Sequence, residues 1–297
     1  MRDRWQAHYL QMNDLRLTLL PGIGGRLWDV EFLGHSLLFQ NPDIVGADVE
    51  HTPIGDLPTR SPQFGFPLWG GEKTWIAPDT SWDNGAPFPT LDSGAYAVTS
   101  KTNTQIEMAS AICPLSHLSI TRRITLTSGN SWTLEHSVIN HGAGTRPTGI
   151  WSVMMLKTPA TIGVELNEPT FDPVFGTAEG MVVKHTKCLV ATCNKQQEFK
   201  VGLPNPNGKT LIFSGKDGLW LTCSVPVPEE PEDYAHQHPV EIFNSGDYAY
   251  CEAEWHSRLR ALGAGETMHF KQTFEVFTDT QAADSLAHHK ELVACMS

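Results

Sequence analysis

Short runs of alternating apolar and polar residues, separated by glycine-containing turns, extend along most of the chain. The first are at residues 15–20 and 26–32, and a short apolar run follows at 37–39. Successive side chains of a β-strand point to opposite faces, so this alternation predicts strands with one buried face. The remaining predicted strands are residues 95–100, 105–111, 118–127, 132–140, 149–157, 181–184, 210–214, 219–224, 240–244, 248–257 and 268–277.

Helical periodicity appears only in the tail. Thr278 or Asp279 is placed to cap a helix that continues over residues 281–294. Short strands at regular spacing predict an all-β fold, a β-sandwich or a barrel. Because no linker or change of composition divides the chain, we predict one domain over residues 1–297.

The charge balance limits the choice of partners. The chain carries 21 basic and 33 acidic residues, a net charge of −12. Nucleic acids and anionic membranes need a basic surface, so neither is an expected partner. The longest apolar run, Ile150–Leu156, is far shorter than the ~20 residues of a membrane helix.

The N-terminus has no apolar segment typical of a signal peptide. The six cysteines contain no CxxC motif, and we predict buried free thiols in a reducing compartment. A cytoplasmic location follows from these two predictions. The cysteines are residues 113, 188, 193, 223, 251 and 295.

The segment YAYCEAEWH, residues 248–256, separates into two faces when its side chains alternate. One face is apolar, with Ala249, Cys251, Ala253 and Trp255, and the other contains Tyr248, Tyr250, Glu252, Glu254 and His256. Aromatic rings and carboxylates together are typical of sugar sites. Repulsion between the two glutamates, with partial burial, raises a carboxyl pKa and suits acid–base catalysis. A plain solvent-exposed strand is the alternative.

Three segments in order resemble the galactose mutarotase-like, or aldose 1-epimerase, superfamily. LLPGIGGRLWDVEFLGHSLLFQNP resembles the opening of those proteins, and CEAEWHSRLRALGAGETMHFKQTFEVF resembles their closing hairpin. WGGEKTWIAP is similar to the segment that borders their sugar pocket, and most similar to a branch with a Gly-Gly-acid-x-x-Trp-x-Ala-Pro motif. The resemblance covers nearly the whole chain.

The resemblance implies a large antiparallel β-sandwich, the mutarotase supersandwich, to which the tail adds a short C-terminal helix. It also implies anomer exchange without a cofactor. In that reaction a glutamate removes the proton of the anomeric hydroxyl while a histidine protonates the ring oxygen. Glu254 matches the glutamate, with Glu252 as its rival. The histidine position falls near Trp151 and Ser152, where this chain has no histidine.

The segment GGEKTWIAP, residues 70–78, is predicted to be a rigid loop, because a core strand is not expected to contain Glu-Lys. Lys73 is expected either to bind an acidic sugar or supply the missing acid, or simply to pair with Glu72. Trp75 and Trp82 either stack on the sugar or form the loop's own core. The full set expected to bind substrate is Arg26, Glu72, Lys73, Trp75, Trp82, Trp151, Tyr250 and His256.

His236, His238, Glu241 and His256 are similar to the four metal ligands of a cupin. The spacing from His238 to Glu241 is short for that motif, and Pro239 interrupts the strand that it needs. We therefore interpret residues 236–241 as a loop at the rim of the site. The prediction is that the protein uses no metal and no other cofactor.

Three functions are compatible with these patterns. The first is a sugar mutarotase or epimerase that acts at the anomeric carbon. The second is a non-catalytic carbohydrate-binding protein that has lost the histidine. The third is a hydrolase or lyase that uses a pair of carboxylates. In each, the partner is a small sugar or sugar derivative, whose identity the sequence leaves open together with the oligomeric state.

Overall fold

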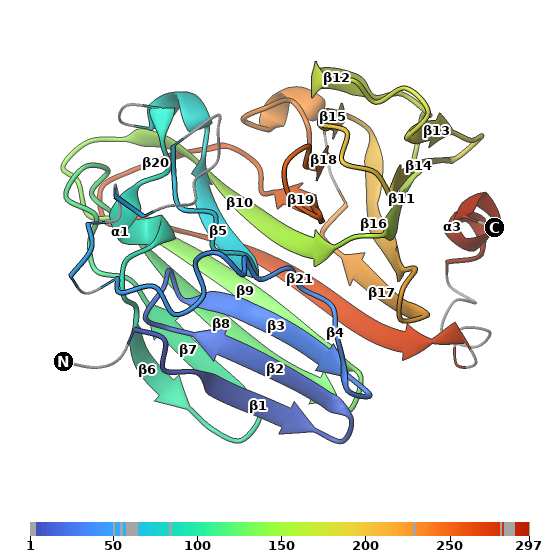
Figure 1. The fold of residues 1–297 in the computed structure, drawn as a ribbon. Helices are drawn as coiled ribbons and strands as arrows, with labels where there is room; N and C mark the ends of the chain where they lie inside the picture. Colours follow the sequence, from blue (N-terminus) through green and yellow to red (C-terminus); the bar gives the residue numbers. More distant parts are fainter. Residues whose placement is uncertain are drawn as a thin grey trace.

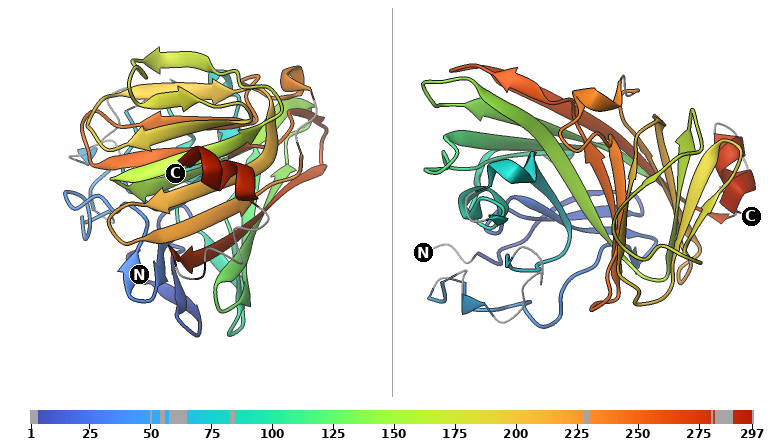
Figure 2. Two further views of the ribbon diagram at one scale, coloured as in Figure 1. Left: turned by 90° about the vertical axis from the view of Figure 1, so that its right-hand side faces the viewer. Right: turned by 90° about the horizontal axis from the view of Figure 1, so that it is seen from above.

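Two large antiparallel β-sheets stack face to face in the computed structural model (Figure 1, Figure 2). The structure describes residues 4–49, 51–53, 56–57, 65–82, 85–227, 230–279, 281 and 289–296. Within these residues the all-β prediction and the antiparallel β-sandwich are confirmed.

The first sheet has 11 strands and carries most of the residues predicted to bind substrate. Its strands pair in the order β1 (His8–Met12), β2 (Leu15–Leu20), β3 (Arg26–Phe32), β5 (Glu72–Ala77), β10 (Arg146–Lys157), β19 (Tyr250–His256), β18 (Val240–Asn244), β15 (Phe199–Leu203) and β12 (Asp172–Gly176). Two short strands complete it: β4 (His35–Ser36) pairs with β3, and β20 (Arg260–Leu262) pairs with β10.

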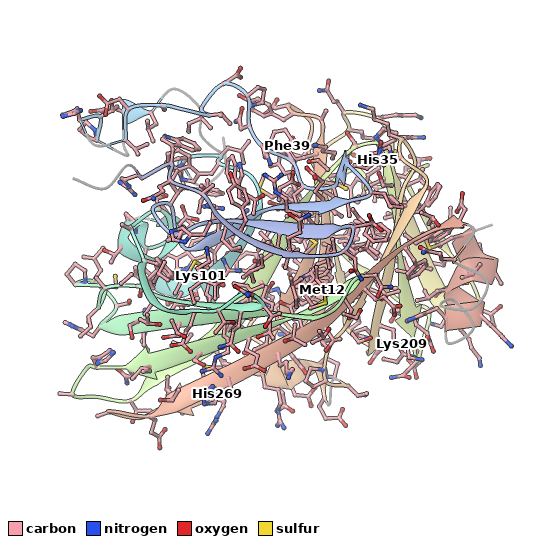
Figure 3. All side chains as sticks on the ribbon, turned by 90° about the horizontal axis from the view of Figure 1, so that it is seen from below. Met12, His35, Phe39, Lys101, Lys209 and His269 are labelled. Carbon is pink, nitrogen blue, oxygen red and sulfur yellow. A yellow bond between two sulfur atoms is a disulfide. The ribbon has the colours of Figure 1, made fainter. Side chains whose placement is uncertain are left out.

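The second sheet has 10 strands and backs the first. Its order is β13 (Val182–Lys184), β14 (Cys188–Cys193), β11 (Ala160–Leu166), β16 (Pro206–Ser214), β17 (Leu219–Ser224), β21 (Thr267–Thr278), β9 (Ser131–Asn140), β8 (Leu118–Ser128), β7 (Gln105–Ala109) and β6 (Ala97–Lys101). The labelled side chains Phe39 and His35 lie on the side of the molecule opposite His269 of β21 (Figure 3).

The helical segments in the described part of the chain are short. They are η2 (Asp79–Ser81), α1 (Pro89–Asp92), η4 (Pro231–Asp233) and α3 (Lys290–Met296). The tail helix was predicted over residues 281–294, of which 282–288 lie outside the described residues. α3 packs beside β11 and β14, at the end of the molecule away from β6 (Figure 1).

The core lies between the sheets and follows from the alternation of the strands. In β9, for example, every second residue is buried, from Trp132 to Asn140. One large apolar cluster includes residues of both sheets, such as Trp255 of β19 and Phe274 of β21, whose rings are 5.9 Å apart. Burial of apolar area at about 25 cal/mol per Å² holds the two layers together.

The predicted loop at residues 70–78 is wrong, because Glu72–Ala77 forms strand β5 near the middle of the first sheet. All six residues of β5 are buried. A strand of this kind tolerates Glu72 and Lys73 because each charge has its own buried counterion, Arg122 for the first and Glu252 for the second. The expected rigidity therefore comes from sheet pairing rather than from proline.

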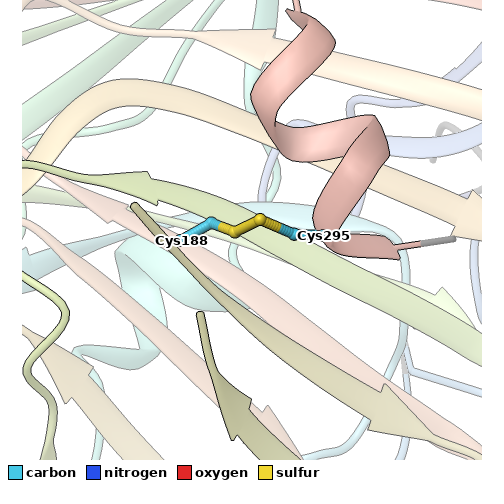
Figure 4. The surroundings of a disulfide bond; sticks show 2 residues. All are labelled: Cys188 and Cys295. Carbon is cyan, nitrogen blue, oxygen red and sulfur yellow. A yellow bond between two sulfur atoms is a disulfide. The ribbon is translucent and has the colours of Figure 1, made fainter. Parts of the chain in front are cut away.

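The cysteine prediction needs a correction as well. Cys188 of β14 and Cys295 of α3 form a disulfide whose Cα atoms are 6.7 Å apart (Figure 4). These two residues are 107 positions apart in sequence, so no local motif marks them as a pair. The other four cysteines, at 113, 193, 223 and 251, are buried free thiols as predicted.

None of the helices described is both long enough and apolar enough to span a membrane.

Candidate active site

The candidate site lies on the side of the first sheet that faces away from the second, and we call it the polar face. Strand β19 defines the two sides. Cys251, Ala253 and Trp255 belong to the core between the sheets. Glu252, Glu254 and His256 point the other way, as the parity of the sequence predicts, and form bonds with residues of neighbouring strands.

Pairing between strands places residues from distant parts of the chain in rows across the polar face. One row joins Lys73, Val153, Glu254 and Glu241 on β5, β10, β19 and β18. The next row joins Trp75, Trp151 and His256. The polar face is therefore assembled by register, because directly paired residues of antiparallel strands project to the same side.

Glu254 is the most enclosed acid of the polar face, with a side chain only 1% exposed. Its Oε2 accepts hydrogen bonds from Trp151 Nε1 at 2.7 Å and from Lys200 Nζ at 2.9 Å. Its Oε1 is buried and has no hydrogen-bond partner among the described residues. Burial raises the pKa of Glu254 to about 7, although the Lys200 charge opposes the shift. A half-satisfied buried carboxylate is costly, which points to a functional reason for it.

Lys200 of β15 is a site residue that the sequence analysis did not identify. Its Nζ lies 2.8 Å from Glu241 Oε2 and 2.9 Å from Glu254 Oε2, and 4.6 Å from the centre of the Trp151 ring. Burial alone would lower the pKa of Lys200, but the two carboxylates raise it above its usual value. The alternation Phe199-Lys200-Val201-Gly202-Leu203 was the available signal for this strand, although nothing in it identifies the partners of the lysine.

Glu252, the rival to Glu254, is paired with Lys73. Lys73 Nζ donates to Glu252 Oε1 at 3.0 Å and also lies 4.4 Å from the centre of the Trp75 ring. The side chain of Glu252 is 10% exposed. The predicted pairing of Lys73 with Glu72 is wrong, because adjacent residues of a strand point to opposite faces.

Glu72 and Arg26 do not join the polar-face network. Glu72 forms a buried ion pair with Arg122 of β8 in the second sheet, and accepts a bond from Ser152 Oγ at 3.0 Å. Arg26 forms a buried ion pair with Asp92 at 2.9 Å. Each of these charges has a buried counterion within the protein, so the geometry favours a structural role for Glu72 and Arg26.

Aromatic residues form the wall beside Glu254. Trp151 stacks on Trp82 with ring centres 5.7 Å apart, and the edge of Trp75 packs against it at 5.0 Å. Trp75 and Trp82 are both buried, which matches the expectation of a local core, while a contact with sugar stays a prediction. Tyr250, four residues before Glu254 on β19, stacks on Phe39 with ring centres 4.9 Å apart.

Three histidines surround Glu241 of β18. His236 Nδ1 and His238 Nδ1 lie 3.3 and 3.4 Å from its Oε1, and His256 Nε2 lies 3.2 Å from its Oε2. Two of these residues, His236 and His238, come from the segment predicted to be a rim loop, and it does precede β18. Their rings turn inward, so the segment contributes buried side chains to the polar face.

The charged groups shift the pKa values of this cluster in different directions. Lys200 and the three histidines hold the pKa of Glu241 well below its usual value, despite burial. Burial alone would lower the pKa of His236, but Asp79 and Glu241 raise it to about 9. Burial lowers the pKa of His256 to about 4.

Comparison with known proteins gives a fold but no close relative. No protein-family model matches the chain, and no curated protein matches its sequence. Solved structures match over almost the whole length. A protein from Synechocystis sp. PCC 6803 is similar with a TM-score of 0.65 at 14% identity, over 93% of this chain and 97% of that one.

Two further structures carry informative names. A putative aldose 1-epimerase from Escherichia coli K12 has a TM-score of 0.60 at 14% identity, over 92% of this chain and 99% of its own. A galactose mutarotase-like protein from Lactobacillus casei has a TM-score of 0.61 at 10% identity, over 92% and 100%. The chain has the galactose mutarotase-like fold. At this level of identity the likeness concerns the fold alone.

The sequence resemblance places the histidine of a mutarotase-like site near Trp151 and Ser152, a position that stays a prediction. Two histidines from elsewhere in the chain pack against the indole of Trp151. His256 stacks on it at 5.1 Å, and His236 packs edge-on at 4.8 Å. Imidazoles are therefore present beside this part of β10.

Proposed function

We propose that the protein is a carbohydrate-active enzyme that exchanges the anomers of a sugar by general acid–base catalysis. The observation that carries this proposal is Glu254: one carboxylate oxygen is held by Trp151 and Lys200, and the other is left without a partner among the described residues. The mutarotase-like fold is a second support, by analogy.

In the proposed reaction, Glu254 Oε1 removes the proton of the anomeric hydroxyl. The electron pair of that oxygen forms the aldehyde carbonyl while the bond from the anomeric carbon to the ring oxygen breaks. The aldehyde rotates, and the ring closes on its other face when the proton transfers are reversed. No net oxidation or reduction occurs, and the proton returns from Glu254 to the new anomeric hydroxyl.

Lys200 is the proposed proton donor to the ring oxygen. Despite burial, its two carboxylate partners raise its pKa, so proton transfer requires that the sugar displace them from Nζ. Its Nζ is 2.9 Å from Glu254 Oε2, and the two sugar oxygens that exchange protons are bonded to the same carbon. A base and an acid for this reaction must therefore lie close together, and these two groups do. Trp151, which is buried and stacked with Trp82 and His256, orients Glu254 through the hydrogen bond from its Nε1.

Catalysis requires that a sugar reach the carboxylate of Glu254, whereas simple binding to the polar face does not. The side chain of Glu254 is 1% exposed, whereas Lys200 and His236 above the cluster are 11% and 15% exposed. A sugar reaches Glu254 only if these side chains move. If they do not, the polar face serves as a non-catalytic sugar-binding surface, which is the second candidate function.

The test is two-dimensional NMR exchange spectroscopy with catalytic amounts of protein and a panel of neutral, acidic and phosphorylated sugars. Glu254→Gln should lower the exchange rate by a factor of 10² to 10⁴, the usual contribution of a general base. Glu252→Gln is the matched control, since it places the same amide two residues away on the same strand.

Four outcomes separate the proposals. Exchange that depends on Glu254 but not on Glu252 supports the mutarotase. Exchange lost only in Glu252→Gln would identify Glu252, which is paired with Lys73, as the base. Line broadening of a sugar without exchange supports a binding protein, and new products from oligosaccharides would instead indicate a hydrolase or lyase.

A further inference from the structure

The three histidines around Glu241 have an arrangement that acid–base catalysis at Glu254 does not explain. One nitrogen each of His236 and His256 and one oxygen of Glu241 lie within 4.8 Å of one another. His238 approaches the same carboxylate from the loop before β18. The side chains of His236, His238, Glu241 and His256 are 15, 11, 2 and 1% exposed.

The spacing in this cluster is compatible with metal ligands. The three histidine nitrogens lie 3.2 to 3.4 Å from the oxygens of Glu241. His238 and His256 are within hydrogen-bonding distance of it, although hydrogen bonds between charged nitrogen and oxygen are usually shorter, about 2.7 to 2.9 Å. Two ligands that each lie about 2.05 Å from a tetrahedral ion are about 3.3 Å apart.

An outer carboxylate forms a hydrogen bond with His238, and a second carboxylate lies beside His236 without a hydrogen bond. His238 Nε2 lies 3.0 Å from Asp172 Oδ2, and His236 Nε2 lies 3.5 Å from Asp79 Oδ1. In both residues, the nitrogen on the other side of the ring, Nδ1, faces Glu241. A carboxylate behind a histidine fixes its tautomer and turns its free nitrogen to the metal, and this pattern is common in metal sites.

The backbone leaves room for the cluster at one position. A Cβ atom on Gly202 of β15 would lie 2.1 Å from Nδ1 of His238, and 2.3 Å from two other ring atoms. Gly202 is paired with Glu241 in the sheet. Only glycine at 202 therefore allows the imidazole of His238 to lie over the strand beside that glutamate.

Charge also favours a cation. Four carboxylates belong to this part of the polar face, those of Asp79, Asp172, Glu241 and Glu254, and Lys200 is the one lysine or arginine paired with any of them among the described residues. Lys200 contacts Oε2 of Glu241, so Oε1, between His236 and His238, is the oxygen left for an ion.

We propose that His236, Glu241 and His256, with His238 as a fourth ligand, bind one divalent ion of the first transition series. Imidazole nitrogens with one carboxylate suit zinc, iron, nickel or cobalt, whereas calcium and magnesium prefer all-oxygen sites. Glu254 is not among the ligands, so metal binding and anomer exchange can be tested separately. A bound ion would hold His236 in place, and His236 is one of the two side chains that must move before a sugar reaches Glu254.

The experiment is isothermal titration of chelator-treated protein with Zn²⁺, and separately with Mg²⁺. Wild-type protein should bind one Zn²⁺ with a dissociation constant below about 1 μM, or −8.2 kcal/mol, and should not bind Mg²⁺. His238→Ala and Gly202→Ala should each weaken Zn²⁺ binding by about tenfold or more. His269→Ala is the control, because this histidine is exposed on β21 (Figure 3).

A spectroscopic measurement keeps the test independent of variant folding. Co²⁺ added to wild-type protein should give the intense visible absorption of a low-symmetry nitrogen–oxygen site, and Zn²⁺ should displace it. Failure to bind one equivalent, or equal loss in His269→Ala and His238→Ala, would overturn the proposal. Loss of metal binding without loss of anomer exchange would leave the proposed function intact.

Discussion

Glu72 and Lys73 are neighbours in sequence but serve opposite sides of β5. Glu72 enters the space between the sheets and pairs with Arg122, and neither side chain is measurably exposed. Removing one partner of such a pair leaves a buried charge without compensation, which typically costs 3–5 kcal/mol. A surface pair costs far less, because water replaces the lost partner.

Glu72→Gln should therefore lower the free energy of unfolding by about 3–5 kcal/mol. The control is Glu135→Gln on the outer side of β9, where the carboxylate is 34% exposed and pairs with Arg123 and Lys271. That change should cost less than about 1 kcal/mol. Urea unfolding followed by tryptophan fluorescence measures both. Equal effects would mean that the Arg122 pair contributes no more than a surface pair.

His136 of β9 makes stability depend on pH. Its ring lies between Thr74 Oγ1 at 2.8 Å and Gln272 Oε1 at 2.9 Å, fully buried. Burial and the nearby Arg122 charge lower its pKa to about 3. The unfolded chain binds a proton at this residue below a pH of about 6.5, whereas the folded protein does so only near 3.

This histidine should stabilise the fold fully above pH 6.5 and progressively less as the pH falls toward 3. In His136→Gln, the slope of unfolding free energy against pH between 4 and 6 should be smaller by up to about 1.4 kcal/mol per pH unit. Urea unfolding at several pH values tests this. Parallel curves for the variant and wild type would show that the histidine is not buried neutral.

At the scale of elements, α3 is held by one covalent bond and a small apolar cluster. Leu292 of the helix packs with Leu211 and Phe277 beside the Cys188–Cys295 disulfide. A disulfide lowers the conformational entropy of the unfolded chain. In the chain-entropy account, closing a loop of about 100 residues adds up to about 4.7 kcal/mol to the free energy of unfolding.

Cys295→Ala should consequently lower the free energy of unfolding by about 2–5 kcal/mol. Reductant should destabilise the wild-type protein and leave the variant unchanged, which provides an internal control. Thermal unfolding with and without reductant gives the measurement. A reductant effect of the same size in both proteins would show that the bond contributes nothing.

The elements also show where sequence reasoning succeeded and where it stopped. Long strands with one apolar face, such as β8 and β9, follow from alternation alone. Strand β5 could not be predicted in this way. Glu72 and Lys73 fit a core strand only because Arg122 and Glu252, which are distant in sequence, neutralise their charges. The Cys188–Cys295 disulfide was missed for the same reason, because its two residues are 107 positions apart in sequence.

The candidate site was predicted in part for a similar reason. Parity placed Glu252, Glu254 and His256 on one side of β19, and the structure brings them together there. Lys200 was missed because a lone lysine in a short strand carries no signal of its partners. For His236 and His238, the local break at Pro239 concealed the turn that directs both rings toward Glu241.

At the scale of the whole molecule, negative charge dominates. The net charge is −12, and Lys73 and Lys200 of the polar face already have carboxylate partners. Lys157, at the end of β10, forms side-chain hydrogen bonds only with Ser36 among the described residues. The overall negative charge should lower both the association rate and the affinity of an anionic sugar.

If the polar face binds sugar, a neutral hexose should bind more tightly than its 6-phosphate at low ionic strength, and the difference should shrink as salt screens the charges. Titration calorimetry at two salt concentrations tests this. Tighter binding of the phosphate would indicate that a cation receives it, either Lys157 or the metal ion proposed above.

Gly202 has a further consequence for proteins that share this fold. Any other residue at the corresponding position would push the His238 ring away from Glu241. The mutarotase-like scaffold could persist after such a change, but the histidine cluster could not keep its arrangement. A single letter in an aligned sequence would then be enough to sort relatives into those able to assemble the cluster and those that share only the architecture.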